Sequence, residues 1–340
     1  MKQVKIFFIF ILVVFLAAGC GTKRETFEPK KIVAEIEYDG ELPSAIVDVA
    51  RDGATLENGQ IITKDGLSSV VLPRGYMFVN GSKDRFIATS RCGELVVVDQ
   101  DSKIVFKHKF DSMVASASIK GNLLAIVLGN NKLVLLDIDN SKILFEKDGD
   151  SIYAVDSKVA SPYFFTTLLV YPTLDGKLII VDLKTNKVLR DVVVKSEKFF
   201  SNVIFLDVID NRLVAATKKR VVSITPKSMA FLDEDIKDVI ILKDRVLIFT
   251  KDGKILLTNA DLKVLKTKKY KFASFVGTIH GKFIYVVEKA GYLIATDIDL
   301  ISSNVYELPN EIEDKVFTTN DKLYYEKYFF KLEKTRSVDN

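Results

Sequence analysis

One short pattern recurs eight times along this chain of 340 residues. Each copy is an apolar run that usually follows a small or polar residue and ends at a polar one, as in 93–99 and 176–182. The copies end at positions 65, 99, 137, 182, 225, 259, 297 and 333, which gives a mean spacing of about 38 residues. A repeat of this length is typical of proteins built from stacked or circularly arranged structural units.

Two further kinds of run surround each copy. Apolar runs such as 123–127 and 245–249 precede it, and more charged runs such as 103–106 and 142–145 follow several of the copies. β-Branched residues dominate these runs, and Gly, Asn or Asp interrupts them every few residues, which indicates strands joined by tight turns rather than helices. Four short strands per repeat predict an all-β fold, a β-propeller whose blades are four-stranded antiparallel sheets.

The last repeat lacks an outer strand of its own, because only residues 334–340 follow its third strand. Residues 31–38 share the pattern of the outer run 103–110. We therefore predict that this N-terminal strand completes the last blade and closes a ring of eight blades. Seven blades are the alternative if the irregular unit 50–72 or 311–333 does not form a full blade.

The N-terminus has the layout of a secretory signal. Lys2 and Lys5 precede an apolar run over 6–15, which is shorter than the roughly 20 residues that a membrane-spanning helix needs. An uncleaved signal anchor is the alternative. The small residues before Cys20 resemble the lipobox of bacterial lipoproteins, a resemblance that implies cleavage before Cys20 and its acylation, with palmitate among the attached chains.

This resemblance divides the chain into a signal peptide (1–19), a lipidated tether (20–30) and a single propeller domain (31–340). Gly21, rather than Asp, follows the acylated Cys. In bacterial lipoproteins Asp at that position is linked to retention in the inner membrane. We therefore expect the protein to be lipid-anchored in the outer membrane and to face the periplasm.

Charge and composition exclude several classes of function. Lys and Arg exceed Asp and Glu by 49 − 45 = 4, with both signs mixed along the chain, so we expect no nucleic-acid partner. Two Cys exclude a disulfide framework, and two His leave little material for a His-rich metal site. Cys92 has no intramolecular partner if Cys20 is acylated. We interpret it as a packed or tolerated thiol, and a reactive thiol is the alternative.

Motifs for chemistry are equally sparse. The segments 137–142 and 297–299 superficially resemble a Ca²⁺ loop, but Lys142 stands where Gly is needed and Asp148 where Glu is expected. We interpret their Asp residues as turn formers. The sequence has no Gly-rich phosphate loop, GxSxG elbow or HExxH motif. It therefore predicts no catalytic, cofactor-binding or metal site.

The turn between the third and fourth strands carries a family signature. Residues 182–187 read Asp-Leu-Lys-Thr-Asn-Lys, which resembles the Asp-x-x-Thr-Gly-Lys motif of PQQ-type propeller repeats, and 136–145 is similar. Asn186 stands where that family has Gly, and Asn also tolerates a left-handed turn conformation. Phe106 and Phe145 stand near the family's Trp, which this chain lacks. The resemblance covers nearly the whole mature chain.

PQQ-type propellers divide into quinone-dependent dehydrogenases and non-catalytic members. The dehydrogenases need a Ca²⁺ site, a catalytic Asp, aromatic residues that stack on the cofactor and commonly two adjacent Cys. This chain has no adjacent Cys pair and no Trp. It is more similar to the lipoproteins of the outer-membrane β-barrel assembly machinery. That resemblance implies a scaffold that is not an enzyme, needs no cofactor and contacts an outer-membrane barrel-assembly protein.

Partner-binding residues are expected where the repeats are longest, in the segments 161–167 and 195–201. Phe199 and Phe200 lie in a polar stretch and form a candidate aromatic anchor. The alternative is that both side chains fold back on the core.

Two other functions stay open. One is a propeller that binds a small ligand or a cell-envelope polysaccharide at its channel mouth. The other is an enzyme, which a cluster of ionisable residues at the axis would mark.

Overall fold

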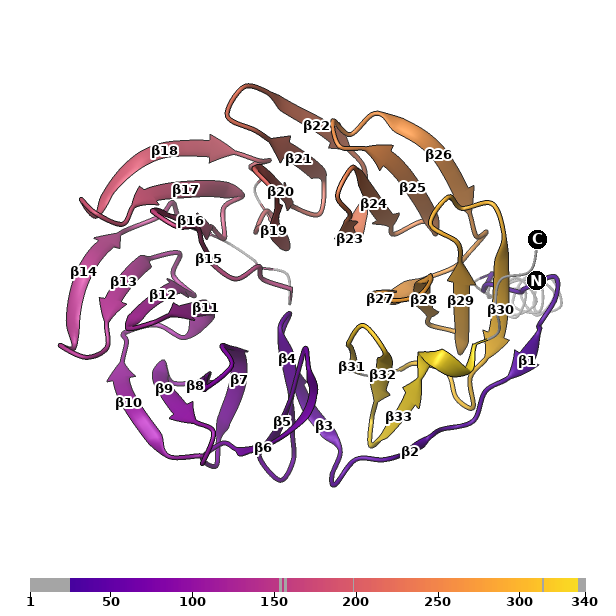
Figure 1. Ribbon diagram of the computed structural model, residues 1–340, viewed down its shortest axis with the longest axis horizontal. Coiled ribbons are helices and arrows are strands. Elements are labelled where there is room, and N and C mark those ends of the chain that lie inside the picture. Colours follow the sequence, from indigo (N-terminus) through magenta and orange to yellow (C-terminus); the bar gives the residue numbers. More distant parts are fainter. Residues whose placement is uncertain (1–24, 153–154, 156–157, 198, 314, 336–340) are drawn as a thin grey trace, which may run out of the picture.

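Eight antiparallel sheets stand around a common axis in the computed structural model (Figure 1). The structure describes residues 25–152, 155, 158–197, 199–313 and 315–335. In blades two to eight the first strand faces the axis and the last strand lies on the rim. The prediction of an eight-bladed all-β propeller is therefore confirmed. Both irregular units form complete blades, so the seven-bladed alternative is wrong.

The first six blades each contain four consecutive strands. Blades one and two consist of β3 (Ile46–Val49), β4 (Gly53–Leu56), β5 (Gln60–Thr63), β6 (Gly66–Val71), β7 (Tyr76–Gly81), β8 (Arg85–Ser90), β9 (Glu94–Asp99) and β10 (Ile104–Lys109). Blades three and four consist of β11 (Val114–Lys120), β12 (Leu123–Leu128), β13 (Leu133–Asp137), β14 (Lys142–Lys147), β15 (Tyr163–Phe164), β16 (Leu168–Pro172), β17 (Lys177–Asp182) and β18 (Lys187–Val193). Blades five and six consist of β19 (Phe205–Ile209), β20 (Arg212–Ala216), β21 (Arg220–Ile224), β22 (Met229–Asp233), β23 (Ile236–Ile241), β24 (Arg245–Thr250), β25 (Lys254–Asn259) and β26 (Val264–Lys269).

The last two blades also use the N-terminal segment. Blade seven contains β27 (Phe275–His280), β28 (Ile284–Glu288), β29 (Tyr292–Thr296), β30 (Ser303–Glu307) and, at its edge, β1 (Ala34–Glu35). Blade eight contains β31 (Val316–Thr318), β32 (Lys322–Tyr325), β33 (Tyr328–Lys331) and β2 (Gly40–Glu41). The 3₁₀-helix η1 (Leu332–Lys334) follows. The described part of the chain contains no helix long and apolar enough to cross a membrane.

Closure by the N-terminal segment is confirmed, but the closing strand is not the predicted one. Residues 40–41 (β2) pair antiparallel with β33, whereas β1, which lies within the predicted strand 31–38, pairs in parallel with β30 of blade seven. The reason is visible at Tyr38, whose ring stacks on Tyr328 at 4.2 Å and lies 4.5 Å from Phe330. The apolar residues of 31–38 therefore cover the junction between blades seven and eight, and the chain reaches β33 only after it.

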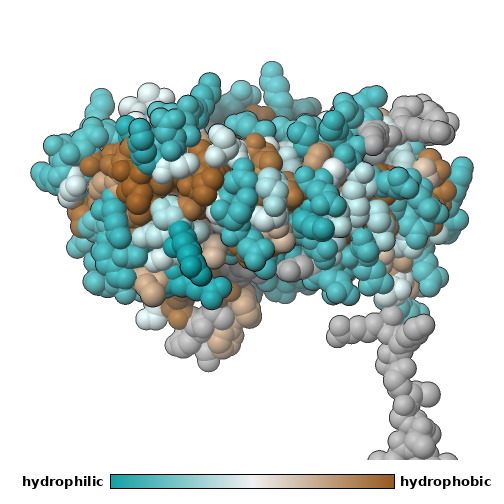
Figure 2. Space-filling view, turned by 90° about the horizontal axis from the view of Figure 1, so that it is seen from below, coloured by the Kyte–Doolittle hydropathy of each residue, from teal (hydrophilic) through white to brown (hydrophobic). Residues whose placement is uncertain are grey.

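The continuous apolar runs follow from burial on both faces of each sheet. In β9, Leu95 and Val97 pack into the cluster shared with blade three, whereas Val96 and Val98 pack into the cluster shared with blade one. Successive side chains of a strand point to opposite faces of the sheet. A strand whose sheet is covered by a neighbouring blade on each face therefore needs apolar residues at every position. The outer strands lack this constraint. Leu189 and Leu265 are more than half exposed, and Figure 2 shows apolar patches among the hydrophilic side chains of the rim.

Candidate functional site

Two segments carry side chains that contact Asp238 on the axis-facing strand β23. One is the turn 50–52 between β3 and β4, which reaches toward the axis in Figure 1. The other is the segment 158–161 before β15. The backbone N–H of Ala160 donates to the carbonyl of Val203 (3.0 Å), and the side-chain amide of Asn202 donates to the carbonyl of Lys158 (2.8 Å). These bonds tie the second segment to the chain that enters blade five.

A buried carboxylate joins these segments to the ring. Asp238 on β23 accepts Lys158 Nζ at 2.8 Å, Thr278 Oγ1 at 3.1 Å and Arg51 Nη1 at 3.5 Å. Burial alone would raise the pKa of Asp238, but Lys158, Arg51 and the hydrogen bonds outweigh it and hold that pKa well below its usual range. Arg51 also donates to the carbonyl of Ile204 (2.9 Å). Blades one, five, six and seven are thus connected through one charge network.

Blade one sends a second turn toward the same region. Burial lowers the pKa of Lys64, in the turn between β5 and β6, and its ammonium lies 5.0 Å from the centre of the Phe317 ring in blade eight. Asp52 accepts a hydrogen bond from Ser161 Oγ at 2.6 Å. The axis therefore holds a cluster of ionisable residues, the feature that would mark an enzyme. Its central carboxylate is ionised and paired with cations, which is the arrangement of a structural ion network.

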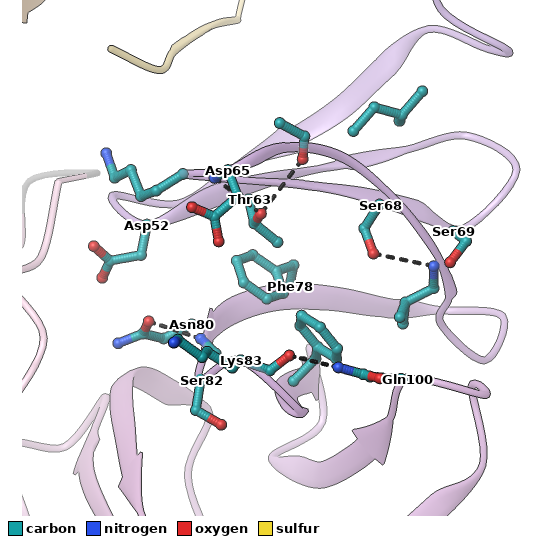
Figure 3. A pocket seen from close by; sticks show the side chains of 16 residues that line it. Asp52, Thr63, Asp65, Ser68, Ser69, Phe78, Asn80, Ser82, Lys83 and Gln100 are labelled. Atoms are coloured by element: carbon teal, nitrogen blue, oxygen red, sulfur yellow. Dashed lines mark hydrogen bonds between the residues drawn. The ribbon is translucent and has the colours of Figure 1, made fainter.

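A polar pocket of about 500 Å³ lies between blades one and two. Figure 3 shows Thr63, Ser68 and Ser69 on one wall and Asn80 and Gln100 on the other, with the Phe78 ring between them. Part of this polar lining is occupied internally. Asn80 Nδ2 donates to the carbonyl of Ala117 (3.0 Å), and Gln100 Nε2 donates to the carbonyl of Lys83 (2.9 Å). The mixture of polar walls and an aromatic ring is the composition that a small-ligand or polysaccharide site would show.

The predicted aromatic anchor lies on the surface. Phe199 and Phe200 follow β18 and are each 49% exposed, so they do not fold back on the core. The turn that carries them is closed at its base, where Ser201 Oγ donates to the carbonyl of Glu197 (2.7 Å) and accepts the Glu197 N–H (2.6 Å). Lys218 Nζ lies 5.3 Å from the centre of the Phe200 ring. Whether this pair contacts a partner stays a prediction.

The other candidate residues occupy ordinary turns or lie outside the described residues. Asp137 accepts the backbone N–H groups of Asp139 (3.0 Å) and Asn140 (3.4 Å), as expected for a turn-forming Asp. Cys92 is exposed and unpaired in the described part of the chain, which corrects the interpretation of a packed thiol but fits a tolerated one. Cys20 and the signal peptide 1–19 lie outside the described residues, as do residues 21–24 of the tether 20–30.

The family model described as "Outer membrane protein assembly factor BamB" matches residues 55–300, from blade one into blade seven. The chain belongs to this BamB family. The crystal structure of BamB from Moraxella catarrhalis superposes with a TM-score of 0.63 over 85% of this chain and 99% of that chain, at 15% identity. The C-terminal WD40 domain of Sif2 superposes with a TM-score of 0.68 at 10% identity, covering 89% of this chain and 99% of that one. These two likenesses show the fold alone.

The relatives found by sequence are named for plasminogen binding rather than for outer-membrane assembly. The plasminogen-binding protein PgbB of Helicobacter pylori strain J99 is 30% identical over 96% of this chain and 71% of its own length. PgbB of strain 26695 is 30% identical over 96% of this chain and 70% of its own length. Membership of the BamB family confirms the resemblance to PQQ-type propellers and supports a propeller scaffold. It leaves the partner open.

Proposed function

We propose that this protein is a lipid-anchored scaffold at the periplasmic face of the outer membrane, where it aids the assembly of outer-membrane β-barrel proteins by binding an assembly protein. The exposed pair Phe199 and Phe200 carries the proposal. Aromatic side chains on a rigid frame are frequent anchors of protein interfaces. Membership of the BamB family supports the assembly role.

The turn is suited to an anchor because contacts within the protein hold its base and one of its two rings. The Ser201–Glu197 hydrogen bonds close it, and Lys218 holds the Phe200 ring from one side. Less conformational freedom is then lost on binding. Full burial of each Phe side chain contributes about 1.5 to 3 kcal/mol. Removal of both rings should therefore weaken binding by at least about tenfold.

The test is affinity purification of the tagged full-length protein from detergent-solubilised envelopes, followed by a salt wash. We expect an outer-membrane barrel-insertion protein to remain bound to the wild type and to be lost from the Phe199→Ala/Phe200→Ala variant. Phe231→Ala on the rim strand β22 is the matched control, because Phe231 is 57% exposed and its loss removes a similar exposed ring away from the turn. A folded, abundant wild type that recovers no such protein would contradict the proposal.

Binding of plasminogen is the second candidate, and the 30% identity to PgbB over 96% of this chain favours it. This function requires the propeller to be displayed on the outside of the cell. Protease treatment of intact cells separates the two candidates, because a periplasmic protein is protected and a displayed one is cleaved. Binding of the purified mature protein to immobilised plasminogen, with immobilised albumin as control, then tests the activity itself.

A further inference from the structure

A basic pocket lies between blades five, six and seven, apart from the polar pocket of Figure 3. It has a volume of about 310 Å³, and its lining contains four lysines and no acidic residue: Lys158, Lys218, Lys237 and Lys251. Its apolar wall consists of Ile204, Ile236 and Phe275, which are at most 2% exposed. Four cations around one small cavity repel one another unless an anion is present.

The carboxylates nearby have other partners. Asp238 is held by Arg51, Lys158 and Thr278, as described above. Asp235 forms an ion pair with Lys219. Glu288 accepts the backbone N–H groups of Ser274 (2.8 Å) and Ala290 (2.7 Å). Asp238 therefore balances the charge of Lys158, one of the four lysines, whereas Asp235 and Glu288 are engaged by groups outside the pocket lysines or by backbone.

The unbalanced positive charge of the pocket lies on Lys237 and Lys251. Among the described residues, the ammonium groups of Lys237 and Lys251 form no hydrogen bond or ion pair. Burial lowers the pKa of Lys237, and Lys158 and Lys251 lower it further, while Asp238 opposes them only in part. Burial also lowers the pKa of Lys218, with Lys251 and Lys237 adding to the effect. An anion between these groups would relieve both the repulsion and part of the burial cost.

Lys218 connects this pocket to the aromatic anchor. It lines the pocket, and its ammonium lies 5.3 Å from the centre of the exposed Phe200 ring. A ligand that places a carboxylate among the lysines can therefore lay an apolar side chain against Phe200. This pairing of an acidic group with an adjacent apolar contact favours a peptide over a free inorganic ion.

We propose that the pocket formed by Lys158, Lys218, Lys237 and Lys251 binds the carboxylates of an acidic peptide segment of a protein partner, with Phe200 contacting an apolar residue beside them. The inference rests on the proposed scaffold function, because it names the chemistry of the partner.

The test uses the mature protein and a fluorescein-labelled peptide in which Glu residues flank a Phe, with a Gln-for-Glu peptide as control. We expect the Glu peptide to bind the wild type, and to bind at least tenfold more weakly to Lys237→Gln/Lys251→Gln and to the wild type at high salt. Lys243→Gln/Lys263→Gln is the matched control, since these lysines lie in the turns at the other end of the blade-six strands. It should bind as the wild type does.

A stability measurement shows whether a loss of peptide binding comes from misfolding. Removal of two mutually repelling cations should leave the urea midpoint of Lys237→Gln/Lys251→Gln equal to or above that of the wild type. Equal binding to both double variants, or equal binding of the Gln peptide, overturns the proposal. So does binding of inorganic phosphate or of anionic lipid vesicles in place of the Glu peptide. If the Glu peptide binds and its binding depends on Lys237 and Lys251, but no barrel-insertion protein is recovered, the proposed peptide site is supported and the proposed assembly role is contradicted.

Discussion

At the residue scale, Asp238 is the side chain whose loss should cost most. Its side chain is 13% exposed, and its carboxylate accepts hydrogen bonds from Lys158, Arg51 and Thr278. Asp238→Asn keeps the shape but leaves two cations without their counter-ion, so we expect the free energy of unfolding to fall by about 3 kcal/mol. Urea denaturation at neutral pH measures this loss. Asp101→Asn, which removes the same charge from an exposed turn, should change stability by less than about 0.5 kcal/mol.

The same carboxylate predicts an acid dependence. The folded-state pKa of Asp238 lies well below the unfolded value of about 3.9. Its contribution is therefore fully present above the unfolded pKa and is lost as pH falls through the folded pKa. We expect wild-type stability to decline below about pH 4, and the difference between wild type and Asp238→Asn to shrink there. A difference that stays constant down to pH 2 would contradict the ionised network.

Backbone conformation gives a second prediction at this scale. Gly75 and Gly176 both have a positive φ, +87° and +85°. A methyl group at Gly75 meets nothing within 4 Å, whereas one at Gly176 would collide with the backbone carbonyl of Lys195. Gly75→Ala should therefore cost only the left-handed strain of about 1 to 2 kcal/mol, and Gly176→Ala clearly more. Equal urea midpoints for the two variants would show that the close approach is absent in solution.

At the scale of the element, the repeat predicted the third strand of all eight blades, including β5 and β33. It also predicted the left-handed turn at Asn186, whose φ is +54°. The charge network was not predictable in the same way. Arg51, Lys158 and Asp238 are far apart in the sequence and follow no motif, so only the closed ring brings them together. The closing strand was missed because β2 has two residues and no recognisable pattern.

The N-terminal segment gives the prediction at this scale. Asp39 and Leu42 donate their N–H groups to the carbonyls of Phe329 (2.9 Å) and Lys327 (2.6 Å). Deletion of residues 21–42 should leave β33 as an open edge and accelerate amide hydrogen exchange over 322–331, with exchange in β12 and β13 unchanged. Deletion of residues 21–26 alone, which keeps the buried Phe27 in place, is the control. Acceleration by that shorter deletion would mean that the tether, rather than β1 and β2, closes the ring.

At the scale of the whole molecule, the proposed location depends on a single thiol. The chain has two Cys, of which Cys92 is exposed on the ring and Cys20 lies outside the described residues. More than one acyl chain is needed for stable attachment, because a single chain binds a membrane only marginally. We expect labelled palmitate to enter the wild type and Cys92→Ser equally and to be absent from Cys20→Ser. Label that persists in Cys20→Ser and disappears from Cys92→Ser would place the lipid on the ring and refute the predicted tether.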